Sequence, residues 1–185
     1  MIITPDWAFI HIPRCAGFAV KEAYVDSGGS ESHIQPILEG DVYGNMPYLA
    51  RFEFWQNHVS DDAEVWAIVR NPYDRIQDCY NRARDLVGEE NCSTFEQFLD
   101  LKNTSQYGPL YTMRDTQKMY IESDRPVRYY KLETELEQAF SDHGLILGDV
   151  VNAADHDDHI LTDQNIEIIN EIFHDDFVEF GYEKR

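Results

Sequence analysis

The stretch WAFIHIPRCAGFAVKEAY, from Trp7 to Tyr24, decides how this chain folds. It begins with a mostly apolar run, residues 7–12, whose length and content of aromatic and β-branched residues are typical of a buried strand. Pro13 ends regular structure, and Gly17 can adopt backbone angles that other residues avoid. The segment Phe18–Tyr24 is then predicted to form a helix with one apolar side. The stretch therefore predicts a strand, a tight turn and a helix in succession.

A strand–turn–helix unit of this kind can bind an anion. The first backbone N–H groups of a helix have no partner within the helix, and the positive end of the helix dipole lies beside them. Arg14 adds a formal charge at the same place. The turn lacks the glycine, lysine and serine or threonine spacing of a Walker A loop. Many such units bind nothing, so this stretch alone leaves a phosphate site and a purely structural turn as alternatives.

The composition limits what the chain can be. At 185 residues with 43% hydrophobic content, it is predicted to fold as a single domain, 1–185, around a sizeable core. Its 15 basic and 35 acidic residues give a net charge of −20, which argues against binding to nucleic acids or anionic membranes. No apolar run approaches the roughly 20 residues that span a bilayer, and three irregularly spaced cysteines indicate reduced thiols. We expect a cytoplasmic protein.

The rest of the chain alternates strands with helices. Two further segments, Ala63–Val69 and Val127–Leu132, have the content of buried strands. The periodicity and capping signals predict helices over 74–87, from Thr94 onward, over 109–121, over 133–140 and from Asp163 onward. Residues 26–47 and 149–158 are predicted to be mostly loop. Strands separated by helices favour an α/β fold with a mainly parallel central sheet and helices on both faces.

A second possible anion site follows the second strand, in RNPYDRIQDCY from Arg70 to Tyr80. Ligands of open α/β sheets bind beyond the carboxyl ends of the strands, where Arg70 is expected. A guanidinium there can hold a phosphate through two parallel hydrogen bonds. The alternative is a structural ion-pair network around the turn, and we favour that interpretation for Asp74 and Arg75. For Arg70 we favour ligand binding.

With two such loops, the chain resembles the sulfotransferase family, in particular the carbohydrate sulfotransferases. FIHIPRCAG, residues 9–17, is similar to the family's 5′-phosphosulfate loop, and VRNPYDRIQDCY, residues 69–80, to its 3′-phosphate motif. The resemblance continues in YYKLETELEQAF, residues 129–140, and in the segment 161–182. It implies a P-loop-like three-layer α/β fold. It also implies transfer of a sulfuryl group from 3′-phosphoadenosine-5′-phosphosulfate (PAPS) to a hydroxyl of a carbohydrate.

The resemblance assigns roles to particular residues. Arg14 would stabilise the departing phosphate, and Arg70 would hold the 3′ phosphate. His58 matches a catalytic histidine of related glycan sulfotransferases and would act as the base, because imidazole can be neutral near pH 7. The alternative is that His58 only packs or hydrogen-bonds in a loop. The positions that match the donor-binding motifs are Arg14, Cys15, Ala16, Gly17, Phe18, Ala19, Arg70 and Asp78.

Several positions depart from the family pattern. Arg14 stands where the family has lysine, and Cys15 replaces a threonine and is interpreted as a small filler. Phe18 and Ala19 replace hydroxyl residues, which leaves the backbone N–H groups to bind the 5′ phosphate. Asp78 stands where a serine would contact the 3′ phosphate. A carboxylate there would repel the phosphate by on the order of 4 kcal/mol unless it is protonated or paired with an arginine.

Two other functions stay open, and the departures at Phe18, Ala19 and Asp78 favour the first of them. The chain could be a non-catalytic relative that retains the fold and binds another nucleotide or a partner. It could also be a P-loop kinase, although it lacks the Walker A lysine and an obvious magnesium-binding aspartate. The cluster of aspartate and histidine at 155–159 contains possible metal ligands. Sulfuryl transfer needs no metal, so we expect no metal cofactor and interpret this cluster as a solvated acidic loop.

Overall fold

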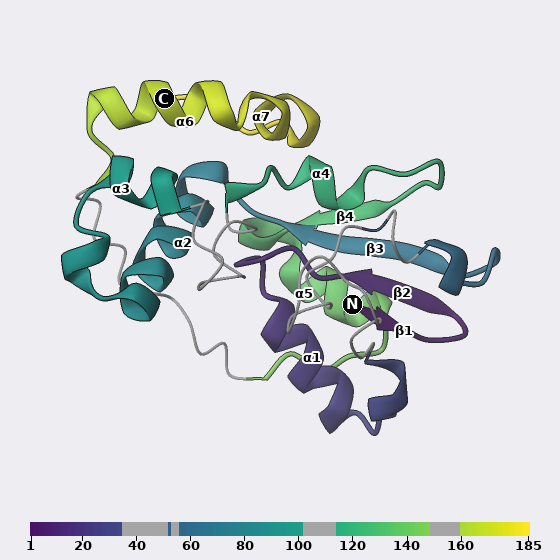
Figure 1. Cartoon of the computed structure of the whole chain (residues 1–185). Helices are drawn as coiled ribbons and strands as arrows, with labels where there is room; N and C mark the ends of the chain where they lie inside the picture. Colours follow the sequence, from purple (N-terminus) through teal and green to yellow (C-terminus); the bar gives the residue numbers. More distant parts are fainter. Residues whose placement is uncertain (35–51, 53–55, 102–113, 149–159) are drawn as a thin grey trace. The chain divides into compact units, whose positions relative to one another are not determined.

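The computed structural model describes residues 1–34, 52, 56–101, 114–148 and 160–185 (Figure 1). The chain divides into two compact units, and each is described by itself. The first comprises Met1–Arg70 and Met119–Val151, and the second comprises Asn71–Lys118 and Asn152–Arg185. No helix within the described residues is long and apolar enough to cross a membrane.

A four-stranded sheet forms the centre of the first unit (Figure 1). Its strands, in spatial order, are β1 (Ile2–Ile3), β2 (Trp7–Ile10), β3 (Glu64–Val69) and β4 (Arg128–Lys131). The strands β2, β3 and β4 are parallel, with Phe9 opposite Trp66 and Trp66 opposite Arg128. The short edge strand β1 is antiparallel to β2 and was not predicted. The sheet is therefore mixed and mostly parallel, which confirms the α/β class.

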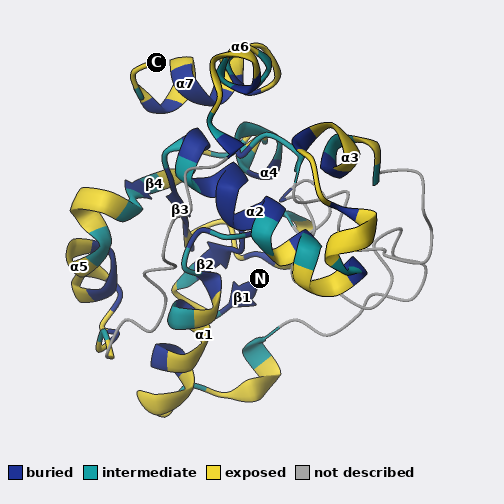
Figure 2. Ribbon diagram, turned by 90° about the vertical axis from the view of Figure 1, so that its left-hand side faces the viewer, coloured by how far each residue is buried: buried dark blue, intermediate teal, exposed yellow. Residues whose placement is uncertain are grey.

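The central strand β3 is apolar on both faces, as predicted. Five of its six residues, Val65–Val69, are buried, and only Glu64 at its start is exposed. Figure 2 shows this burial as a dark blue strand in the middle of the sheet. A parallel strand with neighbours on both sides and covered faces has little room for polar side chains. The run of apolar residues was therefore a reliable signal.

The first unit also contains the helices α1 (Gly17–Asp26) and α5 (Leu132–Asp142) and the short 3₁₀ helices η1 (Glu31–His33) and η4 (Gln56–His58). Val20, Ala23 and Tyr24 form the buried side of α1, as predicted. Helix α5 ends at the expected place, because His143 is its C-cap and Gly144 follows with a φ of 66°. Helix α4 (Lys118–Ile121) begins with the last residue of the second unit and continues into the first.

The second unit is helical in its described part. It contains α2 (Pro72–Val87), η5 (Glu89–Asn91), α3 (Phe95–Asp100), α6 (Asp163–Ile172) and α7 (His174–Phe180). The predicted capping box at the start of α3 is present, since the Thr94 hydroxyl accepts from the Gln97 N–H and the Gln97 side chain accepts from the Thr94 N–H. Helix α2 has a similar start, where the Asn71 side chain accepts from the Tyr73 N–H at 3.0 Å.

Buried residues of these helices form one hydrophobic core. They are Tyr73, Ile76, Cys79, Tyr80, Ala83, Val87, Cys92, Phe95, Phe98, Ile160, Ile169, Phe173 and Phe177. Two predicted core residues, Leu86 and Ile172, are instead exposed. In each case the next residue, Val87 or Phe173, is the one that is buried in the core. Leu86 and Ile172 therefore lie beside the buried side of their helices. All three cysteines of the chain are buried free thiols.

Other expectations about elements were partly wrong. Of the helix predicted over 109–121, the described residues 114–117 are not α-helical, and the α-helix begins only at Lys118. The closing helix predicted from Asp163 is two helices, α6 and α7, because Phe173 leaves the helical conformation between them. The predicted loop 149–158, most of 26–47 and the acidic cluster 155–159 lie outside the described residues.

A buried carboxylate connects α7 to the segment before α4 within the second unit. Asp176 is 0% exposed, and its oxygens accept from the backbone N–H groups of Gln117 and Lys118 at 2.8 and 2.9 Å. Burial raises the pKa of Asp176, against the opposing effects of Arg75 and of these N–H donors. The sequence analysis did not single out Asp176, because a lone aspartate in a helix gives no local sign of burial.

Candidate functional site in the turn after β2

The turn between β2 and α1 has an unusual backbone. Arg14 and Ala16 have φ angles of 65° and 56°, in the left-handed region that residues other than glycine rarely occupy. The Cys15 N–H donates to the Ile12 carbonyl at 3.2 Å, which closes the turn between them. Helix α1 then starts at Gly17, with Ala16 as its N-cap. The chain thus makes the tight strand-to-helix turn that the sequence predicted.

Gly17 is needed in this turn for a reason other than the one expected. It is not among the residues with positive φ, and the left-handed positions are taken by Arg14 and Ala16. A Cβ atom on Gly17 would lie 2.2 Å from Nε2 of His11, well inside contact distance. Only a residue without a side chain can therefore start α1 against this imidazole. The expectation that Gly17 is needed for unusual backbone angles is therefore wrong. Gly17 is needed because the His11 ring lies too close for a side chain.

The start of α1 has the features of an anion-binding helix end. Ala16 cannot cap the helix with its side chain, and the first turn contains no acidic residue. The N–H groups of Gly17, Phe18 and Ala19 are among those that a helix leaves without an intrahelical acceptor. The side chain of Phe18 is 59% exposed. The predicted binding residues at 14–19 thus form one continuous turn, and its backbone supplies the donors.

Arg70 lies beside this turn. It directly follows β3, which runs parallel to β2, and its Nη1 donates to the main-chain carbonyl of Arg14 at 3.3 Å. Arg70 is only 8% exposed. The carboxyl ends of neighbouring parallel strands meet at one edge of a sheet. The structure therefore brings together Arg14 and Arg70, which the sequence predicted to act together.

His58 lies at the other end of β3. Arg125 holds the segment that follows His58, because its guanidinium donates to the carbonyls of Val59 at 3.0 Å and of Ala63 at 2.9 Å. One side chain thus fixes Val59 beside Ala63, at the amino end of β3. Arg70 follows the carboxyl end of this strand, seven residues and about 20 Å further along. The segment that follows His58 and the residue Arg70 therefore lie at opposite ends of β3.

Asp78 belongs to the second unit, whereas Arg14 and Arg70 belong to the first. It is buried on α2, and so is Arg75 one turn earlier. Nη1 of Arg75 donates to the main-chain carbonyl of Asp115 at 2.9 Å. This hydrogen bond is a structural contact within the second unit, and the ion-pair network expected around the turn stays a prediction.

His11 and Cys15 form the buried underside of the turn. Burial lowers the pKa of His11 to about 3, and the charges of the N-terminal amine and of Lys21 contribute in the same direction. The imidazole is therefore neutral at physiological pH, and the positive charge at the turn comes from Arg14 and Arg70. The Cys15 thiol is buried with its Sγ 3.7 Å from the Pro13 carbonyl, as a small filler would be.

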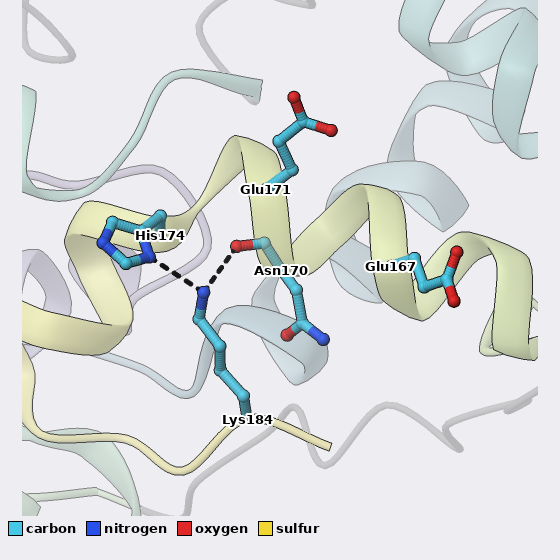
Figure 3. Close-up of a pocket in the computed structure, with 5 residues that line it drawn as sticks. All are labelled: Glu167, Asn170, Glu171, His174 and Lys184. Atoms are coloured by element: carbon cyan, nitrogen blue, oxygen red, sulfur yellow. Dashed lines mark hydrogen bonds between the residues drawn. The ribbon is translucent and has the colours of Figure 1, made fainter.

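An open hollow that the sequence analysis did not identify lies on the second unit (Figure 3). It is lined by Glu167, Asn170, Glu171, His174 and Lys184. The Lys184 ammonium donates to the Asn170 carbonyl at 2.8 Å and lies 2.9 Å from Nδ1 of His174. Figure 3 shows the Lys184 ammonium between the His174 ring and the main-chain carbonyl of Asn170, while the carboxylate of Glu167 points away from them. The hollow has acidic walls, so it does not suit the anionic donor that the first unit suggests.

No cluster of three or more histidine, cysteine, aspartate or glutamate side chains that could hold a metal ion occurs in the described part of the chain.

Comparison with protein-family models, with curated proteins and with solved structures finds no match for the chain.

Proposed function

We propose that the chain binds PAPS and transfers its sulfuryl group to a hydroxyl of a carbohydrate. The backbone of the turn 14–19 holds the 5′ phosphosulfate, and Arg70 holds the 3′ phosphate. A P-loop-like three-layer arrangement around the sheet is part of this proposal. We place the activity in the cytoplasm, since the cysteines are buried free thiols.

The contact between Arg70 and the Arg14 carbonyl carries the proposal. It supports a single anion site made of two sequence motifs that are more than 50 residues apart. The left-handed turn, the uncapped start of α1 and the absence of acidic residues from its first turn add to this support. In a chain with a net charge of −20, positive groups gathered at one sheet edge are the condition for binding an anionic nucleotide.

The transfer exchanges one sulfur–oxygen bond for another. The acceptor hydroxyl oxygen forms a bond to sulfur as the bond between sulfur and the bridging oxygen of the donor breaks. The electron pair stays on the departing phosphate of 3′-phosphoadenosine-5′-phosphate, where Arg14 offsets the growing negative charge. The acceptor proton passes to water. We assign this proton to water and not to His58, because Arg125 holds the segment that follows His58 beside the amino end of β3, whereas Arg70 follows the carboxyl end.

A second candidate is a binding module that holds a nucleotide without transferring sulfate. Two observations favour it. His58, the only base that the resemblance supplied, lies away from Arg14 and Arg70. Phe18 exposes an apolar ring where the family places a hydroxyl that contacts phosphate. Incubation of the chain with radiolabelled PAPS and a panel of glycans distinguishes the candidates, because only the enzyme labels a glycan.

Replacement of Arg70 by alanine should weaken binding of 3′-phosphoadenosine-5′-phosphate at least about tenfold in isothermal titration calorimetry. A buried guanidinium that makes charge-assisted hydrogen bonds to phosphate contributes on the order of 1.5–3 kcal/mol. Arg70→Lys should recover only part of the affinity, because the ammonium lacks the two-pronged geometry. Adenosine 5′-monophosphate, which has no 3′ phosphate, should bind equally to native protein and Arg70→Ala.

Arg128→Ala is the matched control. Arg128 begins β4, at the amino end of the same sheet, and its half-exposed guanidinium pairs with Asp142 at 2.6 Å. Its removal deletes the same charge without touching the turn, so the affinity should stay within about twofold at moderate ionic strength. Circular dichroism confirms that each variant is folded. Absence of binding by the native protein, or equal losses in both variants, would contradict the proposed site.

A further inference from the structure

The turn that starts α1 stores backbone strain. Two residues with side chains, Arg14 and Ala16, occupy the left-handed region within three positions. Each such residue costs free energy relative to the ordinary conformations, so the arrangement persists only where surrounding groups hold it. Arg70 supplies one support through the Arg14 carbonyl. The other end of the turn, at Gly17, also has a close neighbour.

His11 occupies that position. Its imidazole is packed so closely against Gly17 that a Cβ there would lie within 2.5 Å of three ring atoms. Phe18 packs against the ring edge-on with centroids 5.9 Å apart, and the Phe9 ring lies tilted to it with centroids 6.3 Å apart. The ring is buried, so it cannot move aside without disturbing the strand and the helix. The imidazole thus fixes where the backbone of Gly17 and the start of α1 can lie.

We propose that His11 is a positioning residue of the phosphate site: its ring sets the start of α1 so that the N–H groups of Gly17, Phe18 and Ala19 converge on one anion. This inference rests on the proposed function, because it assigns His11 to the same site. His11 touches neither phosphate nor acceptor in this role. His11 acts through Gly17. Its ring occupies the space that a side chain at position 17 would fill, so the ring and the glycine backbone fit closely together.

The imidazole adds no charge to the site. With a pKa lowered to about 3, His11 stays neutral over the whole range in which a nucleotide binds. The expected contribution is therefore one of shape, and the affinity for phosphate should not follow a histidine titration between pH 5 and pH 8. A purely structural histidine in the core would affect the stability of the chain but leave the affinity of the folded protein unchanged.

Variants that enlarge the side chain at position 17 and shrink the one at position 11 test the inference. Gly17→Ala inserts a methyl group into the ring, so we expect affinity for 3′-phosphoadenosine-5′-phosphate to fall about tenfold or more. His11→Ala removes the support and should also weaken binding, by about threefold to tenfold. In the double variant the methyl group enters the space that the ring has left, so its affinity should exceed that of Gly17→Ala.

Gly148→Ala is the matched control, because a Cβ at Gly148 meets no atom within 4 Å. Its affinity and melting temperature should equal those of the native protein. Titration calorimetry with the nucleotide and with inorganic phosphate gives the affinities, and circular dichroism gives the melting temperatures. Unchanged affinity in folded His11→Ala, or losses in the double variant equal to the sum of the single losses, would overturn the inference.

Failure of the proposed function would look different. If the native protein binds neither the nucleotide nor inorganic phosphate, the proposed binding site is refuted, whatever the variants show. The positioning role is then decided by hydrogen exchange of the amides at Ala16–Ala19. His11→Ala must accelerate that exchange while leaving β3 protected, whereas an unchanged exchange rate would refute the role independently of any ligand.

Discussion

Acidification from pH 7 to pH 4 should lower the free energy of unfolding of the first unit by about 3 kcal/mol through His11 alone. The pKa of this residue is about 3 in the folded chain and has an ordinary value of 6.5. Between these values the unfolded chain binds a proton that the folded chain does not. Each pH unit in this window therefore removes about 1.4 kcal/mol of stability. The contribution is fully present above pH 6.5 and is lost as the pH falls toward 3.

His143 changes stability with the same sign. Its ring is stacked on Trp66 with centroids 3.9 Å apart, and burial lowers its pKa. Loss of acidic-group repulsion on acidification acts in the opposite direction in a chain with a net charge of −20. The absolute stability at each pH therefore sums several groups, and the contribution of His11 must be obtained by difference.

The measurement is urea unfolding followed by tryptophan fluorescence, since Trp7 and Trp66 belong to the sheet of the first unit. Native protein and His11→Asn are compared at pH 7, 6, 5 and 4. The variant is less stable at neutral pH because it leaves space under Gly17, but its stability should depend less on pH. The difference between the two proteins should shrink by about 3 kcal/mol over this range. Parallel pH profiles would show that His11 does not carry this dependence.

Replacement of Asp176 by alanine should destabilise the second unit by about 3–5 kcal/mol. The carboxylate is completely buried and accepts hydrogen bonds from two backbone N–H groups and from the Gln117 side chain at 3.4 Å. Its removal leaves these donors without an acceptor and the buried Arg75 without its nearby negative charge. Each buried donor left without an acceptor costs about 1–3 kcal/mol, so the loss of these hydrogen bonds accounts for a cost of this size.

Asp175→Ala is the control for this prediction. Asp175 is the preceding residue, and its exposed carboxylate lies 3.6 Å from the Lys118 ammonium. An exposed ion pair contributes at most about 1 kcal/mol, so this variant should melt close to the native temperature. Asp176→Asn keeps one acceptor oxygen and should lie between the two. Hydrogen exchange of α2 and α7 peptides reports the stability of the second unit, and equal protection in all three variants would contradict the role of Asp176.

Acidification changes the stability contributions of His11 and Asp176 in opposite directions. Histidine is charged when it is protonated, whereas aspartate is charged when it has lost its proton. Burial raises the pKa of Asp176, so its contribution to stability is greatest at low pH and is lost as the pH rises through its folded pKa. Burial lowers the pKa of His11, so its contribution is greatest at high pH. In both cases the charged form is the one that the interior disfavours.

The sequence by itself determined the elements whose signals are local. The apolar run in β3, the capping box at Thr94 and the Gly144 turn after α5 depend on residues within one element, and each was predicted at its place. The adjacency of Arg14 and Arg70 also followed, because parallel strands must present their carboxyl ends at one edge.

Only the tertiary structure decided the features that depend on residues distant in sequence. Arg125 places His58 at the far end of β3 through hydrogen bonds that span more than 60 residues. The burial of Asp176 depends on donors that lie nearly 60 residues earlier in the chain. The need for glycine at position 17 depends on which way the His11 ring turns, which no residue pattern shows. Periodicity and capping describe one element at a time, whereas these contacts exist only once the elements have packed together.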